Sequence, residues 1–198
     1  MNLDSHIEEI LQLEIPQERR EILRVLIDYI QEKKTVGDEI NLNFICTHNS
    51  RRSQFAQVWS ALAAHAFGIK VTCLSGGVEV TALNKRVVDS LKRFGFVVSS
   101  TGTQNPVYSL EFALNTEPLA LFSKLFDDKV NQKKKFAAVM TCDHADENCP
   151  HIPGTEQRIS VNYNDPKEFD DTVLEQKKYD ERSSQIASEM FYVFSKIN

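Results

Sequence analysis

One run of residues constrains this chain more than any other: Cys46 is followed by Arg52 and Ser53 in the pattern Cys-x5-Arg-Ser. An apolar stretch at 40–45 precedes the run, and a helix-like pattern extends from it to about residue 67. A strand, a tight turn and a helix would gather the backbone N–H groups of the turn at a helix N-terminus, where unpaired donors and the helix dipole favour an anion. The sequence therefore predicts an oxyanion-binding loop formed by Thr47, His48, Asn49, Ser50, Arg51 and Arg52.

The side chains of this run suit nucleophilic chemistry on a bound anion. The same donors would stabilise a thiolate at Cys46, which would be nucleophilic near neutral pH. Arg52 supplies a planar fork that binds two oxygens of a tetrahedral oxyanion. Ser53 can donate its hydroxyl to the sulfur, and Asn49 tolerates the positive φ that such a turn usually needs. The alternative is a buried cysteine that happens to precede an arginine, and the strand-turn-helix context disfavours it.

Composition is that of a globular protein with one main domain. At 198 residues the chain can bury a core without disulfide bonds, and 26% charged and 41% hydrophobic residues are ordinary for this class. The net charge of −5 argues against general nucleic-acid binding, and no apolar run approaches the length of a membrane span. The first residues lack the basic and apolar regions of a signal peptide, and the four cysteines suggest reduced thiols. We therefore expect a cytoplasmic protein that binds neither nucleic acid nor membrane.

Alternating strand and helix patterns predict an α/β domain behind a helical extension. Residues 1–36 form this N-terminal extension, and residues 37–198 form the main domain. The strands expected in the domain lie at 40–45, 70–75, 136–141 and 158–161. Their alternation with helices predicts a parallel sheet covered by helices on both faces. Because the loops after parallel strands meet at one rim, Cys46, Cys142 and Asp165 should lie together.

Residues 101–135 have a weaker local pattern than the rest of the domain, and because they lie between two strands of the predicted parallel sheet they are called the inserted segment below. A short strand is expected to begin at Phe96, and residues 106–113 alternate like a strand. Residues 119–126 fit either the hairpin partner of that strand or a short helix. The insertion therefore lies between the second and third strands of the predicted parallel sheet.

Two further thiols, Cys142 and Cys149, follow the buried strand at 136–141, and three interpretations are open. As a redox pair, Cys142 would attack a sulfur adduct on Cys46, and Cys149 would then attack Cys142. As a zinc site, the segment would use an unusual ligand spacing. The zinc ligands would be Cys142, His144, Cys149 and His151. As buried or idle thiols, the pair would do neither.

The redox interpretation has a geometric consequence. If residues 142–149 are helical, the two cysteines lie on one face but about 10 Å apart, because a helix rises about 1.5 Å per residue. A disulfide needs Cα atoms within roughly 7 Å. Oxidation would therefore have to unwind this segment, which would act as a conformational switch.

Asp165 before Pro166 is the candidate general acid. A carboxyl group held over the thiolate could protonate a leaving oxygen. Asp-Pro is also common in ordinary turns, which is the competing interpretation. Its position after the last predicted strand strengthens the catalytic interpretation, and both stay open.

These pieces together resemble the low-molecular-weight protein tyrosine phosphatase superfamily and, among its branches, the thioredoxin-coupled arsenate reductases. The resemblance covers roughly residues 40–197 and leaves residues 1–36 outside it. Residues 46–54 look like the family's anion loop, and Asp165 with Pro166 matches its general-acid dipeptide. Residues 142–150 are similar to the redox pair of the reductases, which plain phosphatases lack.

The resemblance implies a four-stranded parallel sheet flanked by helices and a mechanism without a metal or organic cofactor. Cys46 would attack arsenate held by the loop amides and Arg52, while Asp165 helps water to leave. Cys142 would then attack Cys46 and release arsenite. Cys149 would resolve the product as a Cys142–Cys149 disulfide, which a thioredoxin-like reductant would reduce.

Several positions depart from the family pattern. His48 and Arg51 stand where the reductases usually carry a small residue and a cysteine. Gln57 stands where potassium-binding reductases carry an acid, which argues against a potassium site. Residues 167–169 are Lys-Glu-Phe, whereas the phosphatases tend to carry tyrosines there, which disfavours phosphotyrosine.

Three functions remain in competition. The first is arsenate reduction through a three-cysteine relay, and the second is hydrolysis of phosphotyrosine or another phosphomonoester. Chemistry on Cys46, Arg52 and Asp165 is common to both, so Cys142 and Cys149 are what distinguishes them. The third is a non-catalytic anion-binding module whose N-terminal helices offer a partner surface, and the complete Cys, Arg and Asp set disfavours it.

Overall fold

A computed structural model describes residues 3–113, 116–148 and 151–198. Its centre is a four-stranded sheet in the order β2-β1-β6-β7, in which every neighbouring pair is parallel. The strands are β1 Asn41–Cys46, β2 Thr72–Gly77, β6 Phe136–Met140 and β7 Thr155–Ser160. The predicted four-stranded parallel sheet is therefore confirmed, with strand bounds shifted by at most three residues.

The two central strands are apolar because both of their faces are covered. Every residue of β1 and β6 is buried, as expected for the middle of a parallel sheet. Two residues of β1 are polar although they are buried. Both are asparagines, and each donates from its side-chain amide to a backbone carbonyl. Asn41 donates to Lys135 O at 3.2 Å, and Asn43 donates to Phe126 O at 2.9 Å.

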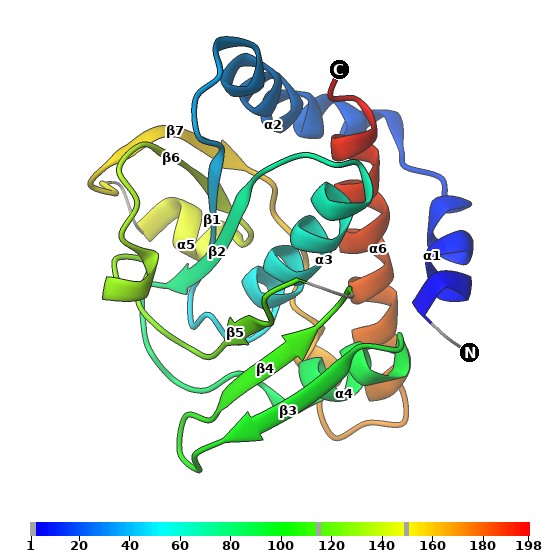
Figure 1. Ribbon diagram of the computed structural model, residues 1–198. Helices are drawn as coiled ribbons and strands as arrows, with labels where there is room; N and C mark the ends of the chain where they lie inside the picture. The colour runs from blue at the N-terminus through cyan, green and yellow to red at the C-terminus, as the bar shows by residue number, and fades with distance from the viewer. Residues whose placement is uncertain (1–2, 114–115, 149–150) are drawn as a thin grey trace.

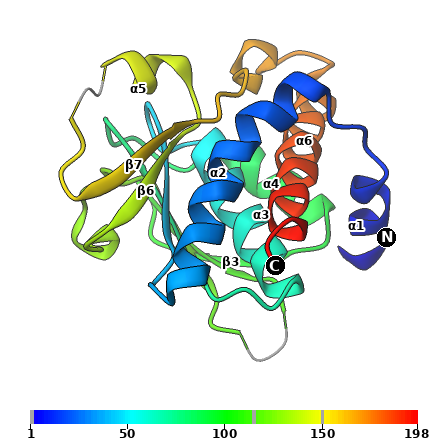
Figure 2. The same ribbon diagram turned by 90° about the horizontal axis from the view of Figure 1, so that it is seen from above.

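Helices cover the sheet unequally (Figures 1 and 2). One face carries α3 (Arg52–Ala66), which packs on β1 and β2, together with α6 (Glu175–Ser195) and α2 (Gln17–Val36). The other face carries α5 (Asp143–Asn148), which packs on β1 and β6. Phe55, Trp59 and Leu62 of α3 are buried, and the Trp59 indole donates to Ser183 Oγ in α6 at 2.9 Å.

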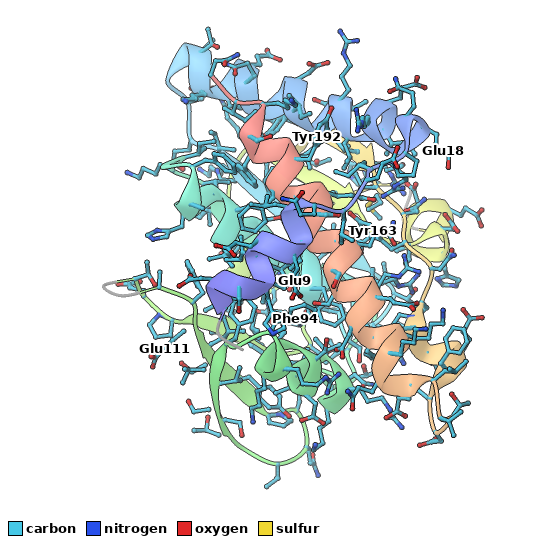
Figure 3. All side chains as sticks on the ribbon, turned by 90° about the vertical axis from the view of Figure 1, so that its right-hand side faces the viewer. Glu9, Glu18, Phe94, Glu111, Tyr163 and Tyr192 are labelled. Carbon is cyan, nitrogen blue, oxygen red and sulfur yellow. The ribbon has the colours of Figure 1, made fainter. Side chains whose placement is uncertain are left out.

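The N-terminal extension folds as two helices rather than one continuous run. Helix α1 (Leu3–Leu11) lies over α6, and α2 follows after a break at 12–16 (Figure 3). Leu23, Leu26 and Ile30 of α2 have no exposed surface and belong to the same hydrophobic cluster as the main sheet. The extension is thus packed into the body of the molecule.

The inserted segment forms a second, antiparallel sheet in the order β3-β4-β5. Its strands are β3 Val97–Thr101, β4 Val107–Glu111 and β5 Leu119–Leu121, and α4 (Lys85–Arg93) precedes them. The hairpin alternative for 119–126 is therefore correct over β5. Two short 3₁₀ turns complete the chain, η1 Lys129–Asn131 and η2 Pro166–Phe169. Within the described residues, no helix is long and apolar enough to cross a membrane.

Candidate active site

The predicted anion loop lies at the carboxyl end of β1, between Cys46 and the start of α3. Cys46 is buried, with 3% of its surface exposed. The backbone N–H groups of residues 47 to 53 donate to no acceptor within the described part of the chain. Asn49 has φ of +47°, as predicted for this turn. The loop thus presents a row of unused donors beside a thiol.

Ser53 is oriented toward the sulfur by a second hydrogen bond. Ser53 Oγ lies 3.1 Å from Cys46 Sγ, and it accepts a hydrogen bond from Asn49 Nδ2 at 2.9 Å. Because Asn49 occupies a lone pair of Ser53, the serine hydrogen remains available for the sulfur. The hydroxyl would therefore stabilise a Cys46 thiolate.

Arg52 and Asp165 form an ion pair over the loop. Arg52 Nη2 donates to Asp165 Oδ2 at 2.8 Å, and Nη1 donates to Tyr163 O at 3.0 Å. Its buried Nε–H has no partner among the described residues. Asp165 caps η2 by accepting from Lys167 N at 3.1 Å. A small hollow is lined by Cys46, His48, Ser50, Arg51, Arg52 and Asp165.

The remaining loop side chains are used in ways that the sequence did not predict. Ser50 Oγ donates to Ala82 O at 2.7 Å, and Arg51 Nε donates to Tyr179 OH at 3.1 Å. His48 Nε2 lies 3.2 Å from Glu79. Four residues predicted to bind the oxyanion therefore bond other partners with their side chains, namely Thr47, His48, Ser50 and Arg51. Their backbone N–H groups have no acceptor among the described residues.

The inserted segment holds the loop in shape. Ser123 Oγ donates to His48 O at 2.7 Å, and Lys124 N donates to Asn49 Oδ1 at 3.1 Å. Gln54 Nε2 bridges Asn49 O and Phe122 O, both at 2.9 Å. The loop conformation therefore depends on residues more than sixty positions away, a dependence that no local pattern signals.

Gly77 at the end of β2 packs directly against the loop. A Cβ there would lie 2.7 Å from Asn49 N and 2.8 Å from Thr47 O, which is too close for any side chain. Thr47 O also accepts from Val78 N and Glu79 N, both at 2.9 Å. The strand after the anion loop thus forms one wall of the site.

Cys142 lies just after β6 and contacts the anion loop. It is 1% exposed, and its Sγ lies 3.5 Å from Thr47 Oγ1 and accepts from Ala145 N at 3.4 Å. Cys46, Cys142 and Asp165 therefore border one loop, as the rim argument predicted. Cys149 lies outside the described residues, so its place in the site stays a prediction, as does the zinc alternative that needs it.

Other titratable and polar groups near the loop are structural. Burial raises the pKa of the Cys73 thiol to about 12, so this cysteine is an inert core residue. Gln57 is hydrogen-bonded to Ser75 Oγ and to Cys73 O, at 2.6 and 3.2 Å. No group of three metal-ligating side chains occurs in the described ranges.

Three residues far apart in the sequence support the Asp165 segment. Tyr163, beside α6 (Figure 3), donates its hydroxyl to Glu189 Oε2 at 2.8 Å, and Arg19 binds both oxygens of Glu189 at 2.9 and 2.7 Å. Arg19 also donates to Asn162 O at 3.2 Å. Burial, followed by the charge of Glu189, raises the pKa of Tyr163 well above its usual value. The N-terminal extension thus contacts the segment that carries Asp165.

The sequence of this chain is similar to those of several known proteins. No family model matches the sequence. The chain is 26% identical over 129 residues to arsenate reductase 2 of Staphylococcus saprophyticus, a match that covers 65% of this chain and 80% of the relative. The arsenate reductase of Halalkalibacterium halodurans is also 26% identical over 129 residues, covering 76% of its length.

Among solved structures, a YwlE mutant from Bacillus subtilis has a similar fold, with a TM-score of 0.51 at 12% identity. The similarity covers 79% of this chain and 97% of that one. In sequence the chain is similar to named arsenate reductases, and in fold it is similar to the YwlE mutant.

Proposed function

We propose that this protein reduces arsenate to arsenite through a relay of three cysteines, Cys46, Cys142 and Cys149. The observation that carries the proposal is the second thiol beside the anion loop. Cys142 Sγ lies 3.5 Å from the hydroxyl of Thr47, the residue that follows Cys46. Ester hydrolysis has no use for that thiol, whereas reduction requires it. The named arsenate reductases among the sequence relatives support the same activity.

In the first step, the Cys46 thiolate attacks arsenic in a bound arsenate. The loop N–H groups and Arg52 hold its oxygens, and one arsenic–oxygen bond breaks as sulfur bonds to arsenic. Arg52, 2.8 Å from Asp165 in the structure, turns to the anion, and Asp165 enters the step protonated. It gives this proton to the departing oxygen, which leaves as water, and the resulting carboxylate is protonated again from solvent. The product is a Cys46 thioester of arsenic(V).

In the second step, the Cys142 thiolate attacks Cys46 Sγ. A sulfur–sulfur bond forms while the sulfur–arsenic bond breaks, and its electron pair stays on arsenic. Arsenic is thereby reduced from As(V) to As(III) and leaves as arsenite, while the two thiols are oxidised to a disulfide.

In the third step, Cys149 attacks Cys142, and the Cys46 thiolate is released. The resulting Cys142–Cys149 disulfide is reduced by an external dithiol of the thioredoxin type, which supplies the two electrons spent on arsenic. The cycle uses protein thiols and one oxyanion and calls for no metal or organic cofactor.

Phosphomonoester hydrolysis is the second candidate, favoured by the set of Cys46, Arg52 and Asp165. These residues could form a cysteinyl-phosphate and protonate the leaving oxygen, after which water would release phosphate. Lys167 and Phe169, after Asp165 and Pro166, leave the site without the tyrosines that the phosphatases tend to carry there.

A coupled assay separates the two candidates. Arsenate-dependent consumption of NADPH is measured with thioredoxin and thioredoxin reductase for wild type, Cys142→Ser and Cys149→Ser, with aryl phosphate hydrolysis alongside. The reductase proposal expects arsenate turnover to be lost in both variants while Cys46-dependent hydrolysis is largely kept. Strong hydrolysis without arsenate turnover in wild type would make the protein a phosphatase.

A further inference from the structure

The first turn of α5 carries a histidine that the relay described above does not use. His144 Nδ1 lies 3.3 Å from Thr47 Oγ1, and the same hydroxyl lies 3.5 Å from Cys142 Sγ. Thr47 therefore bridges an imidazole and the second thiol of the site. His144 is exposed, whereas Cys142 is 1% exposed.

We propose that Cys142, Thr47 and His144 form a proton relay that generates the attacking thiolate, an inference that rests on the proposed reductase function. The thiol proton passes to the Thr47 oxygen while the Thr47 proton passes to His144 Nδ1. No electrons move in this step: one S–H bond breaks, one N–H bond forms, and the products are a thiolate and an imidazolium. The imidazolium stays beside the thiolate, and the attraction between the two opposite charges favours the ionised thiol.

The Thr47 hydroxyl can make the hydrogen bonds needed both before and after the proton transfer. A threonine hydroxyl has one hydrogen and two lone pairs. Before transfer, Cys142 donates to Thr47 Oγ1, which donates to a neutral His144 Nδ1. After transfer, the imidazolium donates to Thr47 Oγ1, which donates to the thiolate. Each state uses the two recorded contacts and needs only the hydrogens to move.

Buried thiols need such assistance. Burial disfavours the thiolate, and the deeply buried Cys73, with no hydrogen-bonding partner for its sulfur among the described contacts, has its pKa raised to about 12. Cys142 is also buried but must be a thiolate to attack Cys46. The Ala145 N–H, at 3.4 Å from Cys142 Sγ, gives further support to the charge.

Other titratable and charged groups lie around this relay on several elements. On α5, Asp146 is paired with Arg158 of β7. Asp143 lines an open hollow together with Arg52 and Asp165, which bind each other at 2.8 Å. The loop is also faced by the Cys46 thiol of β1, by Arg51, which lies 3.6 Å from Asp165, and by the pair formed by His48 and Glu79.

The test reads the ionisation of Cys142 directly. In a Cys46→Ser/Cys149→Ser background, thiolate absorbance in the ultraviolet is followed against pH, and the Cys46→Ser/Cys142→Ser/Cys149→Ser spectrum is subtracted to remove tyrosines and Cys73. Introducing His144→Asn or Thr47→Val should raise the midpoint of thiolate formation by about one pH unit, a tenfold change in the ionisation equilibrium. Thr47→Ser, which keeps the hydroxyl, should restore it. Circular dichroism verifies that each variant is folded.

Two comparisons make the outcome decisive. The double variant His144→Asn/Thr47→Val should have nearly the same midpoint of thiolate formation as either single variant, because each single change already interrupts the relay. His151→Asn, an exposed histidine beyond α5, should leave the midpoint unchanged. An unchanged midpoint in His144→Asn, or an equal shift in His151→Asn, would overturn the relay. Since no arsenate is used, this result is independent of whether the protein proves to be a reductase.

Discussion

At the scale of single residues, the site is organised by hydroxyl groups that orient hydrogens toward sulfur. Ser53 has its lone pair occupied by Asn49 and its hydrogen available for Cys46. Thr47 Oγ1 lies 3.5 Å from Cys142 Sγ, as Ser53 Oγ lies near Cys46 Sγ. Each thiol of the site that the structure describes therefore has a hydroxyl partner, whereas the buried core cysteine Cys73 has none among the described contacts.

Ser53→Ala should slow the reaction of Cys46 with iodoacetamide at neutral pH by at least about tenfold, because a hydrogen bond to a charged group contributes about 1.5–3 kcal/mol. The measurement is made in a Cys142→Ser/Cys149→Ser background, so that Cys46 is the reactive thiol. Ser60→Ala is a matched control on the same helix, since Ser60 Oγ is buried and has no partner among the described residues. Equal rates in wild type and Ser53→Ala would show that the 3.1 Å contact does not stabilise the thiolate.

At the scale of elements, α5 connects the thiol chemistry to the edge of the sheet. Its Asp146 carboxylate binds Arg158 and Ser160 of β7 and lies 3.3 Å from Asn162 Nδ2. Burial acts to raise the pKa of Asp146, but the hydrogen bonds from Ser160, Arg158 and Asn162 outweigh it and lower the pKa below its usual 3.8. The helix that follows Cys142 is therefore anchored by a charge.

This anchor predicts a specific pH dependence of stability. Since the pKa of Asp146 is lower in the folded than in the unfolded protein, its stabilisation is present above the unfolded value and is lost as pH falls through the folded one. Between neutral pH and about pH 3, wild type should therefore lose more of its urea-unfolding free energy than Asp146→Asn does. Asp143→Asn, an exposed change in the same turn, should follow the wild-type curve. Parallel curves for wild type and Asp146→Asn would contradict the anchor.

The same helix should unwind when the relay is oxidised. Helix α5 includes residues 143–148, and two positions seven residues apart on a helix are separated by about 10 Å, which is too long for a disulfide. Oxidation that forms the Cys142–Cys149 bond should accelerate amide hydrogen exchange across 143–148, while Cys142→Ser should not respond. Unchanged protection in the oxidised protein would mean that the disulfide forms without unwinding, or between other thiols.

Local sequence patterns were sufficient to predict the strands that are buried along their whole length. Strands β1 and β6, buried throughout, and the positive φ of Asn49 were predicted because each has a short-range signal. The strand expected at Phe96 proved to belong to the separate antiparallel sheet, since a short strand carries no signal of which partner it will pair with. The contact of Thr47 with His144 and the support of Asp165 by Glu189 were missed for a related reason: these pairs are distant in sequence and meet only after folding.

At the scale of the whole molecule, the N-terminal extension is joined to the site through a buried ion pair. Arg19 of α2 and Glu189 of α6 are 170 positions apart, and the Glu189 side chain is 2% exposed. Burial acts to lower the pKa of Arg19, but Glu189 outweighs it, so the pKa is raised. Through Asn162 O and Tyr163, this pair reaches the segment that ends in Asp165.

Arg19→Ala should destabilise the protein by about 3–5 kcal/mol, because it leaves the buried Glu189 carboxylate without its cationic partner. The measurement is the free energy of urea unfolding at neutral pH. Arg24→Ala is the matched control in α2, since its ion pair with Asp28 is exposed and such pairs contribute about 0–1 kcal/mol. Similar losses for both variants would show that the extension rests on the domain without a specific buried contact.

The most direct test of the central claim is a single turnover of fully reduced Cys149→Ser protein with arsenate and no external reductant. The products are quenched with acid and analysed for arsenite and, by mass spectrometry, for disulfides. The account predicts one arsenite for each Cys46–Cys142 disulfide formed, and neither product in Cys142→Ser. Arsenite release without that disulfide, or no arsenite at all while Cys46 still hydrolyses aryl phosphates, would contradict it.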